Sequence, residues 1–450
     1  MRSTPMVVVM AWLTCGAVVA AADPAPSSIA TDRAVWGSYN LLPGAEPAAP
    51  AEPVAPAPAA ANPQGIDLTQ ATALAEANSP RLRAARAAVD QAYGQMIQAG
   101  LYPNPRVDNG NPQFILGGVN SVYNVGLTQT MVTAGKLRLS RAAAGQSVRQ
   151  EELTLIRTWY DLLTDVRQQF FAVVAAQQRI EILEQLVTIL HQSEKTSTDL
   201  LGAGRVSETD VLLTRIEREQ AQAKMFSQQQ QIVGSRRQLA ATLGLPSLPI
   251  ERVDGELNLR ITILDQGSVA AEALARNAEV RRAEVDVTRN QVLLSRARAE
   301  PVPNIIWQGG YQRTLSEVSP SQGTIGVYLD VPIWDRNQGN IRSASASVRQ
   351  ALAALGITQN EIIAAAANAE ARYRAAQAVV ENYERGLLPD ARRSVELIQK
   401  GYEQGLFDIL RLLQAQRALV EANLDYITAQ LERLDAAAEL AGILQLEQFP

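Results

Sequence analysis

The sequence predicts an α+β protein made of two tandem repeats, in which long helices carry pairs of short strands. Three observations support this prediction. Local patterns recur at a spacing of about 200 residues, and helical stretches without proline run far beyond ordinary length. Short segments with period-2 alternation precede each long helical stretch. Each repeat therefore combines a helical body with a strand pair.

The composition excludes several classes of function. The 450-residue chain is 19% charged with a net charge of −5, so it lacks the basic surface that nucleic-acid binding requires. It contains one histidine, His191, and one cysteine, Cys15. His/Cys metal cages, a disulfide framework and Ser-His or Cys-His nucleophiles away from these two positions are therefore excluded. We expect no enzyme activity and no cofactor, and we expect His191 to be a solvated or packed helical side chain.

The N-terminus is typical of an export signal. Arg2 precedes an apolar segment, Met6 to Leu13, that is too short to span a bilayer, and three alanines ending at Ala22 form a small-residue cleavage site. We expect residues 1–22 to be a signal peptide. The alternative is a lipoprotein signal in which Cys15 is acylated.

The rest of the chain divides into a tether and two repeats. Residues 23–65 are rich in Pro and Ala and predict an extended tether. Beyond it, four landmarks occur twice: Ala73-Leu74-Ala75 and Ala273-Leu274-Ala275, Pro103-Asn104 and Pro303-Asn304, Gly126–Arg138 and Tyr328–Arg342, Gly204 and Gly405. We infer a tandem duplication with repeat 1 at 66–255 and repeat 2 at 256–450.

Each repeat contains two segments with the alternation of a β-strand. Ile325, Val327 and Leu329 alternate with Thr324, Gly326 and Tyr328, and a weaker alternation surrounds Leu127. We expect strands near 106–116, 119–132, 304–314 and 323–333. Aromatic residues gather in these segments although they make up only 5% of the chain. Composition alone fits a small soluble sheet and membrane strands equally well, because interfacial strand ends favour Trp and Tyr.

The long helices are more informative. No proline occurs from Leu137 to Leu201, and apolar residues follow 3/4 spacing from Leu153 to Val174 if Arg167 fills one gap. At 1.5 Å per residue such a helix is on the order of 100 Å long. An ordinary coiled coil is the alternative, but a coiled coil does not carry two strand pairs at matched positions.

Four strands are too few to close a barrel in one chain. A membrane β-barrel has at least about eight strands and leaves no open edge in lipid. Two or more copies, each giving four strands, satisfy this requirement. The sequence therefore implies an oligomeric tube, with helices emerging from one end of a shared barrel.

The layout over residues 66–450 resembles the TolC-like outer membrane efflux factor family. Three motifs resemble its heavy-metal-efflux branch: YPNP (Tyr102 to Pro105), LTQTMVTAGK (Leu127 to Lys136) and VPIWDRNQGNIRSASA (Val331 to Ala346). The resemblance implies an α+β membrane channel. A homotrimer would form a twelve-stranded transmembrane β-barrel in the outer membrane and a long α-helical barrel in the periplasm.

The resemblance also implies a function. The chain would be the passive outer membrane exit duct of a tripartite efflux system, docked to a periplasmic adaptor (membrane fusion protein) and an inner-membrane pump of the RND type. Metal cations or small toxic compounds are the expected cargo, outer membrane lipid is an expected partner, and nucleic acid is not. The alternative is a periplasmic adaptor or structural coiled-coil protein of an export complex, a class without this whole-chain duplication.

The resemblance further places a periplasmic gate at two Gly-marked turns, near Gly202–Gly204 and Gly401–Gly405. Family positions match this sequence at Asp210, Tyr402 and Gly405. We expect Tyr402 to donate a hydrogen bond to Asp210 and hold adjacent helix pairs closed.

Two further gate positions depart from the family pattern. Arg411 and Gln414 stand where some relatives carry a ring of aspartates, and a threefold ring of Arg411 would repel cations. The alternative is that Arg411 faces away from the lumen and pairs with a carboxylate on a neighbouring helix.

Overall fold

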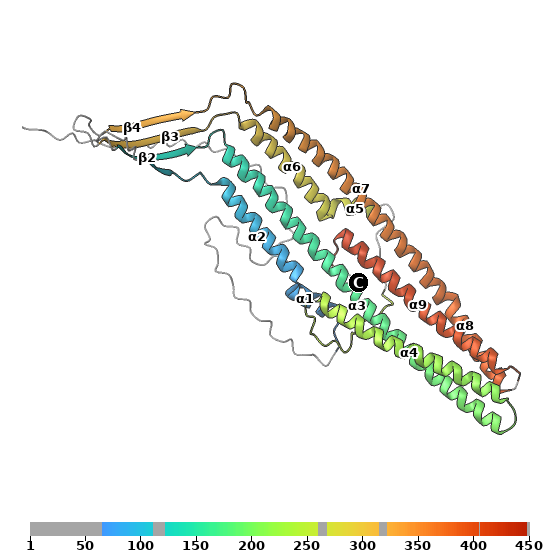
Figure 1. Ribbon diagram of the computed structural model, residues 1–450. Coiled ribbons are helices and arrows are strands. Elements are labelled where there is room, and N and C mark those ends of the chain that lie inside the picture. The colour runs from blue at the N-terminus through green and yellow to red at the C-terminus, as the bar shows by residue number, and fades with distance from the viewer. Residues whose placement is uncertain (1–64, 111–121, 260–267, 315–321, 405, 448–450) are drawn as a thin grey trace, which may run out of the picture. The chain divides into compact units, whose positions relative to one another are not determined.

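The computed structural model describes residues 65–110, 122–259, 268–314, 322–404 and 406–447, all within one compact unit. Its elements follow the same order twice (Figure 1). The first half contains α1 (Leu68–Asn78), α2 (Pro80–Gly100), β1 (Arg106–Gly110), β2 (Val122–Met131), α3 (Lys136–Gly202) and α4 (Glu208–Thr242). The second half contains α5 (Val269–Arg276), α6 (Ala278–Ala299), β3 (Ile305–Thr314), β4 (Gln322–Leu329), α7 (Gln338–Asn382), α8 (Leu388–Glu403) and α9 (Ile409–Leu444).

Corresponding helices in the two halves break in the same way. Ser79 separates α1 from α2, and its hydroxyl accepts from the Leu82 N–H. Asn277 separates α5 from α6, and its side-chain oxygen accepts from the Glu279 N–H at 2.9 Å. Both residues have extended backbone and satisfy an N–H that the helix start leaves free.

The predicted long helix is confirmed. α3 has 67 residues, which corresponds to a length of about 100 Å. Its middle is buried where α9 packs against it, with Leu163, Phe170 and Val174 all less than 5% exposed. Arg167 does fill the gap in the apolar spacing and is itself buried. Its guanidinium donates to the carbonyl of Glu447 at 2.8 Å, which ties the C-terminal residues to α3.

The counterpart of α3 in the second half is not one regular helix. Between α7 and α8, residues Tyr383–Leu387 form a π-helical turn. Pro389, the second residue after this turn, lacks the N–H that would donate to the Arg385 carbonyl, so the regular helical pattern cannot pass through it. The sequence prediction of a second long helix is therefore corrected to two α-helices joined by a π-turn.

The four strands form one antiparallel sheet in the order β1-β2-β3-β4. The strands are those predicted, within the described residues; the segment 111–121 lies outside them. β4 ends at Leu329 rather than 333 because Pro332 cannot donate to a ladder and the Ile333 N–H turns back to the Val331 carbonyl.

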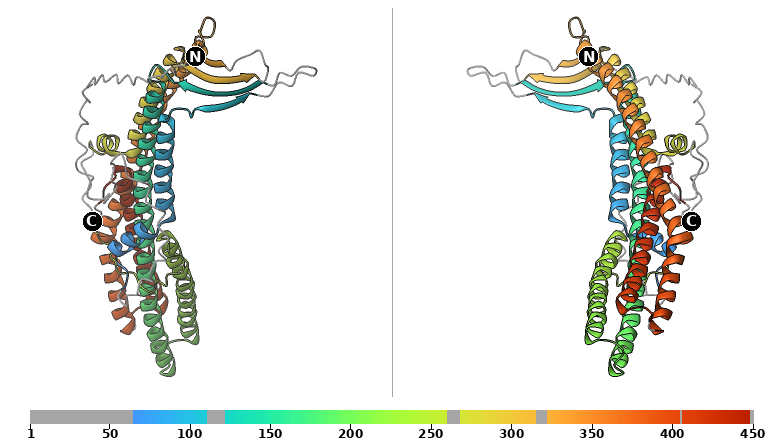
Figure 2. Two further views of the ribbon diagram at one scale, coloured as in Figure 1. Left: turned by 90° about the vertical axis from the view of Figure 1, so that its left-hand side faces the viewer. Right: turned by 90° about the vertical axis from the view of Figure 1, so that its right-hand side faces the viewer.

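The helices nearest the sheet follow the strand order. α2 leads into β1, β2 into α3, α6 into β3 and β4 into α7, and contacts join α2 to α3, α3 to α6 and α6 to α7 (Figure 2). The turns between α3 and α4 and between α8 and α9 lie at the end away from the strands (Figure 1). One row of four strands therefore continues into one row of four helices.

The expected signal peptide (1–22) lies outside the described residues, as does the expected tether (23–65) apart from Gly65. The described part of the chain begins at a parallel bridge in which the Ile66 N–H donates to the Arg252 carbonyl and the Asp254 N–H donates to the Ile66 carbonyl. The side-chain amide of Gln177 also pairs with both backbone groups of Val253. The end of the first half is thereby fixed against α3.

Candidate functional site

The sheet has two chemically different faces. Side chains alternate along each strand, and the register puts the alternate positions of all four strands on common faces. One face is apolar and solvent-exposed, with exposed fractions from 38% at Trp307 to 82% at Ile325. Its exposed apolar members include Val107, Val125, Leu127, Met131, Ile305, Trp307, Tyr311, Ile325, Val327 and Leu329, and Gln129 shares the face with them. An exposed apolar surface of this extent fits contact with lipid.

The opposite face is mainly polar. The Thr128 hydroxyl donates to the Asp108 carboxylate at 2.7 Å across the β1–β2 pair. Other polar members include Arg106, Thr130, Gln308, Gln312 and Thr324, and Ile306 and Tyr328 share the face with them. Polar-inside and apolar-outside alternation is the pattern of a membrane β-barrel strand.

Glycine shapes the centre of the apolar face. A shallow groove of about 360 Å³ is lined by Val107, Leu127, Trp307, Gly309 and Tyr311 among others. A Cβ at Gly309 would lie 2.9 Å from Cη2 of Trp307, so the absence of a side chain lets the indole lie along the strand. The aromatic residues that gather in the strand segments of the sequence therefore have a defined geometry here.

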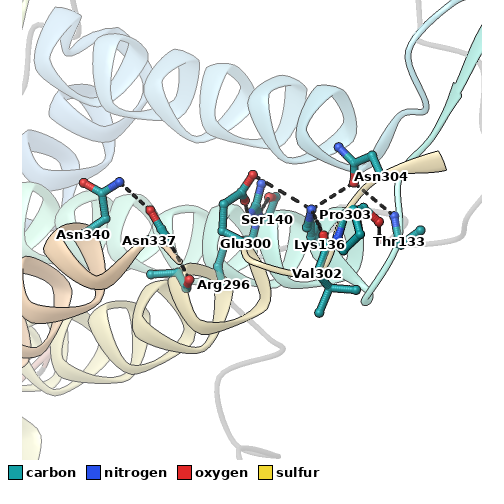
Figure 3. A network of polar contacts seen from close by, with 11 residues as sticks. Thr133, Lys136, Ser140, Arg296, Glu300, Val302, Pro303, Asn304, Asn337 and Asn340 are labelled. Atoms are coloured by element: carbon teal, nitrogen blue, oxygen red, sulfur yellow. Dashed lines mark hydrogen bonds and ion pairs between the residues drawn. The ribbon is translucent and has the colours of Figure 1, made fainter. Parts of the chain in front are cut away.

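A buried lysine joins the two halves where sheet and helices meet (Figure 3). Lys136 follows Ala134 and Gly135, both with left-handed backbone, and opens α3. Its side chain is 2% exposed, and the ammonium group donates to the Val302 carbonyl at 2.6 Å and to Asn304 Oδ1 at 2.9 Å. A buried ammonium needs such partners, because an isolated charge in this setting is strongly destabilising.

Neighbouring side chains complete this junction. The Thr133 N–H donates to Asn304 Oδ1 at 3.3 Å, and the Thr133 hydroxyl donates to the Pro303 carbonyl at 2.6 Å. On the adjoining side, the Asn337 amide donates to the Ala297 carbonyl at 2.8 Å. The Pro-Asn and TAGK motifs noted in the sequence therefore meet in one polar network, and the sequence alone did not predict this contact.

At the other end of the helices, the structure places Asp210 and Tyr402 near the same pair of turns. Asp210 lies in the first turn of α4, and its carboxylate accepts from the N–H and hydroxyl of Ser207 at 2.9 Å. The Tyr402 hydroxyl lies 3.4 Å from Ser197 Oγ, which joins α8 to α3. Among the contacts of the described residues, Tyr402 and Asp210 do not pair with each other within one chain.

Of the remaining predicted gate residues, Arg411 and Gln414 lie on α9. Arg411 and Gln414 are exposed, and Gly405 lies outside the described residues. The Arg411 N–H donates to Asp408 Oδ1 at 3.2 Å, and its guanidinium lies 5.4 Å from the centre of the Phe407 ring. None of the ion pairs within the described segments includes Arg411, so its charge is held against an aromatic ring.

Two contacts at this end were missed from the sequence. Arg417 on α9 forms an ion pair with Glu217 on α4, which ties the two helix pairs of one chain together. Phe407 lies directly over Gly401, where a Cβ would approach the ring to 2.3 Å. A glycine followed six positions later by an aromatic residue was the only available signal.

Buried charges occupy the middle of the helical body. The Arg433 guanidinium is 5% exposed and donates to the carbonyls of Leu257 and Leu259 and to Gln377 Oε1. Burial raises the pKa of Asp435 to about 6, and Glu432 adds to the shift while Arg372 opposes it. The Arg433 guanidinium thereby fixes the segment that follows the first half.

In the described part of the chain, no group of three or more His, Cys, Asp or Glu residues is placed to hold a metal ion. Searching the same residues for a helix able to cross a membrane finds none that is both long and apolar enough. The features of chemical interest are therefore the two-faced sheet, the lysine junction and the helix turns.

Comparison with known proteins finds similarity to one protein family over part of the chain, and a similar fold among solved structures. Residues 269–444 match the outer membrane efflux protein family. The chain is 25% identical over 388 residues to the cobalt-zinc-cadmium resistance protein CzcC of Cupriavidus metallidurans, covering 84% of this chain and 90% of that protein. It is 24% identical to the pyoverdine export outer membrane protein OpmQ of Pseudomonas putida, covering 83% and 84% of the two chains. A crystal structure of CusC superposes with a TM-score of 0.75 at 18% identity, covering 84% of this chain and 91% of that one.

Proposed function

We propose that this chain, an outer membrane efflux protein of the TolC-like heavy-metal-efflux branch, is the outer membrane exit duct of a tripartite efflux system. The β-sheet lies in the outer membrane and the helices extend into the periplasm. The single observation that carries the role is the sheet with one apolar and one polar face, set on helices about 100 Å long. A periplasmic adaptor or structural coiled-coil protein would not account for a sheet with one apolar and one polar face.

We propose that three copies assemble, since four strands cannot enclose a lumen. Three copies give twelve strands, within the range of outer-membrane barrels, and leave no open edge in lipid. The apolar face then contacts lipid and the polar face lines the channel. Transport through such a duct is passive.

We propose that the chain docks to a periplasmic adaptor and an inner-membrane pump of the RND type. One relative is named for cobalt, zinc and cadmium resistance and the other for pyoverdine export. Metal cations or small toxic compounds are therefore the proposed cargo, with selection made by the pump.

Membrane fractionation and metal tolerance test the role directly. The protein should remain in the outer membrane fraction after a high-salt wash, and deleting its gene should lower tolerance to Co²⁺, Zn²⁺ or Cd²⁺. Release of the protein by salt would favour the adaptor class instead. Unchanged tolerance to all three metals, in a strain in which the protein stays in the outer membrane, would remove the metal cargo and leave the duct.

We also propose a gate at the helix turns. In the assembled duct, Tyr402 donates to Asp210 of an adjacent helix pair and exchanges its present contact with Ser197. A hydrogen bond to a charged group contributes about 1.5–3 kcal/mol when shielded, enough to bias a gate without locking it.

Single-channel conductance in a planar bilayer tests the gate. Tyr402→Phe should raise the open probability, whereas Tyr93→Phe, on the exposed face of α2, should not. Arg411→Asp should increase cation selectivity if Arg411 lines the aperture. Equal open probability for wild type and Tyr402→Phe would reject the latch, and unchanged selectivity would place Arg411 away from the lumen.

A further inference from the structure

The sheet ends in two unpaired strands. β1 and β4 are the outer strands, so each pairs on one side only. In the same way, α2 and α7 are the outer helices of the row next to the sheet. A strand edge open to lipid leaves backbone groups unsatisfied, so in the proposed trimer β4 of each subunit must pair with β1 of the next.

The internal repeat supplies a template for that pairing. β1 pairs with β2 with Arg106 opposite Thr128, and β3 pairs with β4 with Ile306 opposite Tyr328. Gly110 opposite Asn124 matches Gly310 opposite Thr324 in the same way. Every partner is shifted by 200 positions, so β3 corresponds to β1 and β4 to β2, residue for residue.

The pairing of β2 with β3 therefore predicts the pairing of β4 with a neighbouring β1. Within the chain, Thr130 lies opposite Ile306 and Gln129 opposite Trp307. The same register between subunits sets Asp330 opposite Arg106 of the partner subunit. It also sets Leu329 opposite Val107 of the partner subunit, an apolar pair.

We propose that an ion pair between Asp330 and Arg106 of the partner subunit fixes the register in which the barrel closes. This inference rests on the proposed trimer. Both side chains are exposed in the single chain, and none of the ion pairs between described residues includes either one. Both positions belong to the polar face, because Asp330 continues the alternation of Thr324 and Tyr328, and Arg106 that of Asp108.

The charge pair distinguishes this register from its neighbours. A slip of one residue would turn the apolar face of β4 toward the lumen. A slip of two residues in one direction keeps the faces but sets Tyr328 opposite Arg106. The same slip in the other direction sets Asp330 opposite Asp108, so in neither case do the two opposite charges face each other. The corresponding pair inside the chain, Thr130 and Ile306, carries no charge, so the ion pair occurs only where subunits meet.

Exposed apolar residues flank the proposed contact on both sides. Leu101 and Tyr102, before β1, are 53% and 63% exposed. Ile333 and Trp334, after β4, are 58% and 86% exposed. A second copy joined in this register brings the two groups to the same seam, where each covers the other.

Disulfide trapping tests the register. Opposed residues of antiparallel strands have Cα atoms about 4.5–5.5 Å apart, within disulfide range. Arg106→Cys/Asp330→Cys should give a covalent dimer and trimer on oxidation, detected by non-reducing SDS gel electrophoresis. Arg106→Cys/Tyr328→Cys, displaced by two residues, should give roughly tenfold less. Each single variant is the background control, and Thr130→Cys/Ile306→Cys should crosslink within one chain without a ladder.

Charge reversal provides a second, independent measurement. Arg106→Glu and Asp330→Arg should each lower the trimer fraction in detergent, by about tenfold over three seams. The double reversal should restore it. Native mass spectrometry of the wild-type protein distinguishes failure of the proposed register from failure of the proposed duct. If a trimer forms but only the displaced pair crosslinks, or the double reversal does not rescue, the register is wrong and the duct stands. If only monomer is extracted from outer membranes, the duct and the register both fail.

Discussion

Lys136 is expected to hold the sheet to the helices, and replacing it with methionine should destabilise the protein measurably. The substitution removes two hydrogen bonds from a buried charged donor, to the Val302 carbonyl and to Asn304 Oδ1. Hydrogen bonds from charged groups contribute about 1.5–3 kcal/mol each. Methionine fills much of the volume and removes the cost of burying an ammonium, so we expect a net loss of about 2–4 kcal/mol.

Guanidinium unfolding of the purified protein in detergent, followed by tryptophan fluorescence, measures this loss. A change of 2 kcal/mol corresponds to roughly a 30-fold shift of the unfolding equilibrium. Lys195→Met, at an exposed position of the same helix, is the matched control and should change stability by less than about 0.5 kcal/mol.

A double-mutant cycle with Asn304→Ala isolates the pair. The two substitutions should be non-additive, because each removes the same contact. Equal stability of Lys136→Met and Lys195→Met, or full additivity with Asn304→Ala, would refute the junction as described.

Three further predictions concern the helical body. Because burial raises the pKa of Asp435 to about 6, folding favours its protonated form, so its contribution to stability is present below pH 4 and lost as pH rises toward 6. Asp435→Asn should therefore stabilise the protein at pH 7–8 by about 1–3 kcal/mol and not below pH 4, as measured by unfolding at several pH values; a pH-independent effect would contradict this. Gly401→Ala should lower stability by about 1–3 kcal/mol through its clash with Phe407, while Gly356→Ala, with no neighbour within 4 Å, should raise it slightly; a thermal melt in which both variants behave alike would exclude the clash. Gln177→Leu should cost about 1–3 kcal/mol by leaving both backbone groups of Val253 unpaired, and unchanged proteolysis near that residue would argue against the docking.

Local pattern was sufficient for the parts of the fold that depend on periodicity. The alternation around Ile325, the absence of proline from Leu137 to Leu201 and the 3/4 spacing from Leu153 to Val174 are local patterns. The strands and the long helix could therefore be predicted from them. The internal repeat also predicted the order of the elements, because the order of helices and strands in one half indicated the order in the other. Burial of Arg167 was also predictable, since the apolar spacing on both sides required it.

Contacts between distant segments were not predictable in the same way. Lys136 meets Asn304 across more than 160 residues, and Arg417 meets Glu217 across 200, through packing that no local pattern encodes. The π-turn at Tyr383–Leu387 had a local cause in Pro389, which the sequence reading passed over. The pairing of Tyr402 with Asp210 came from family resemblance and depends on how subunits assemble, so it stays a prediction.

The mass of the conducting species tests the central claim most directly. Protein extracted from outer membranes in mild detergent should be measured by native mass spectrometry and the same fraction reconstituted in a planar bilayer. The account predicts that channel activity accompanies a complex of three chains and is absent from single chains. A stable monomer that conducts ions would contradict it.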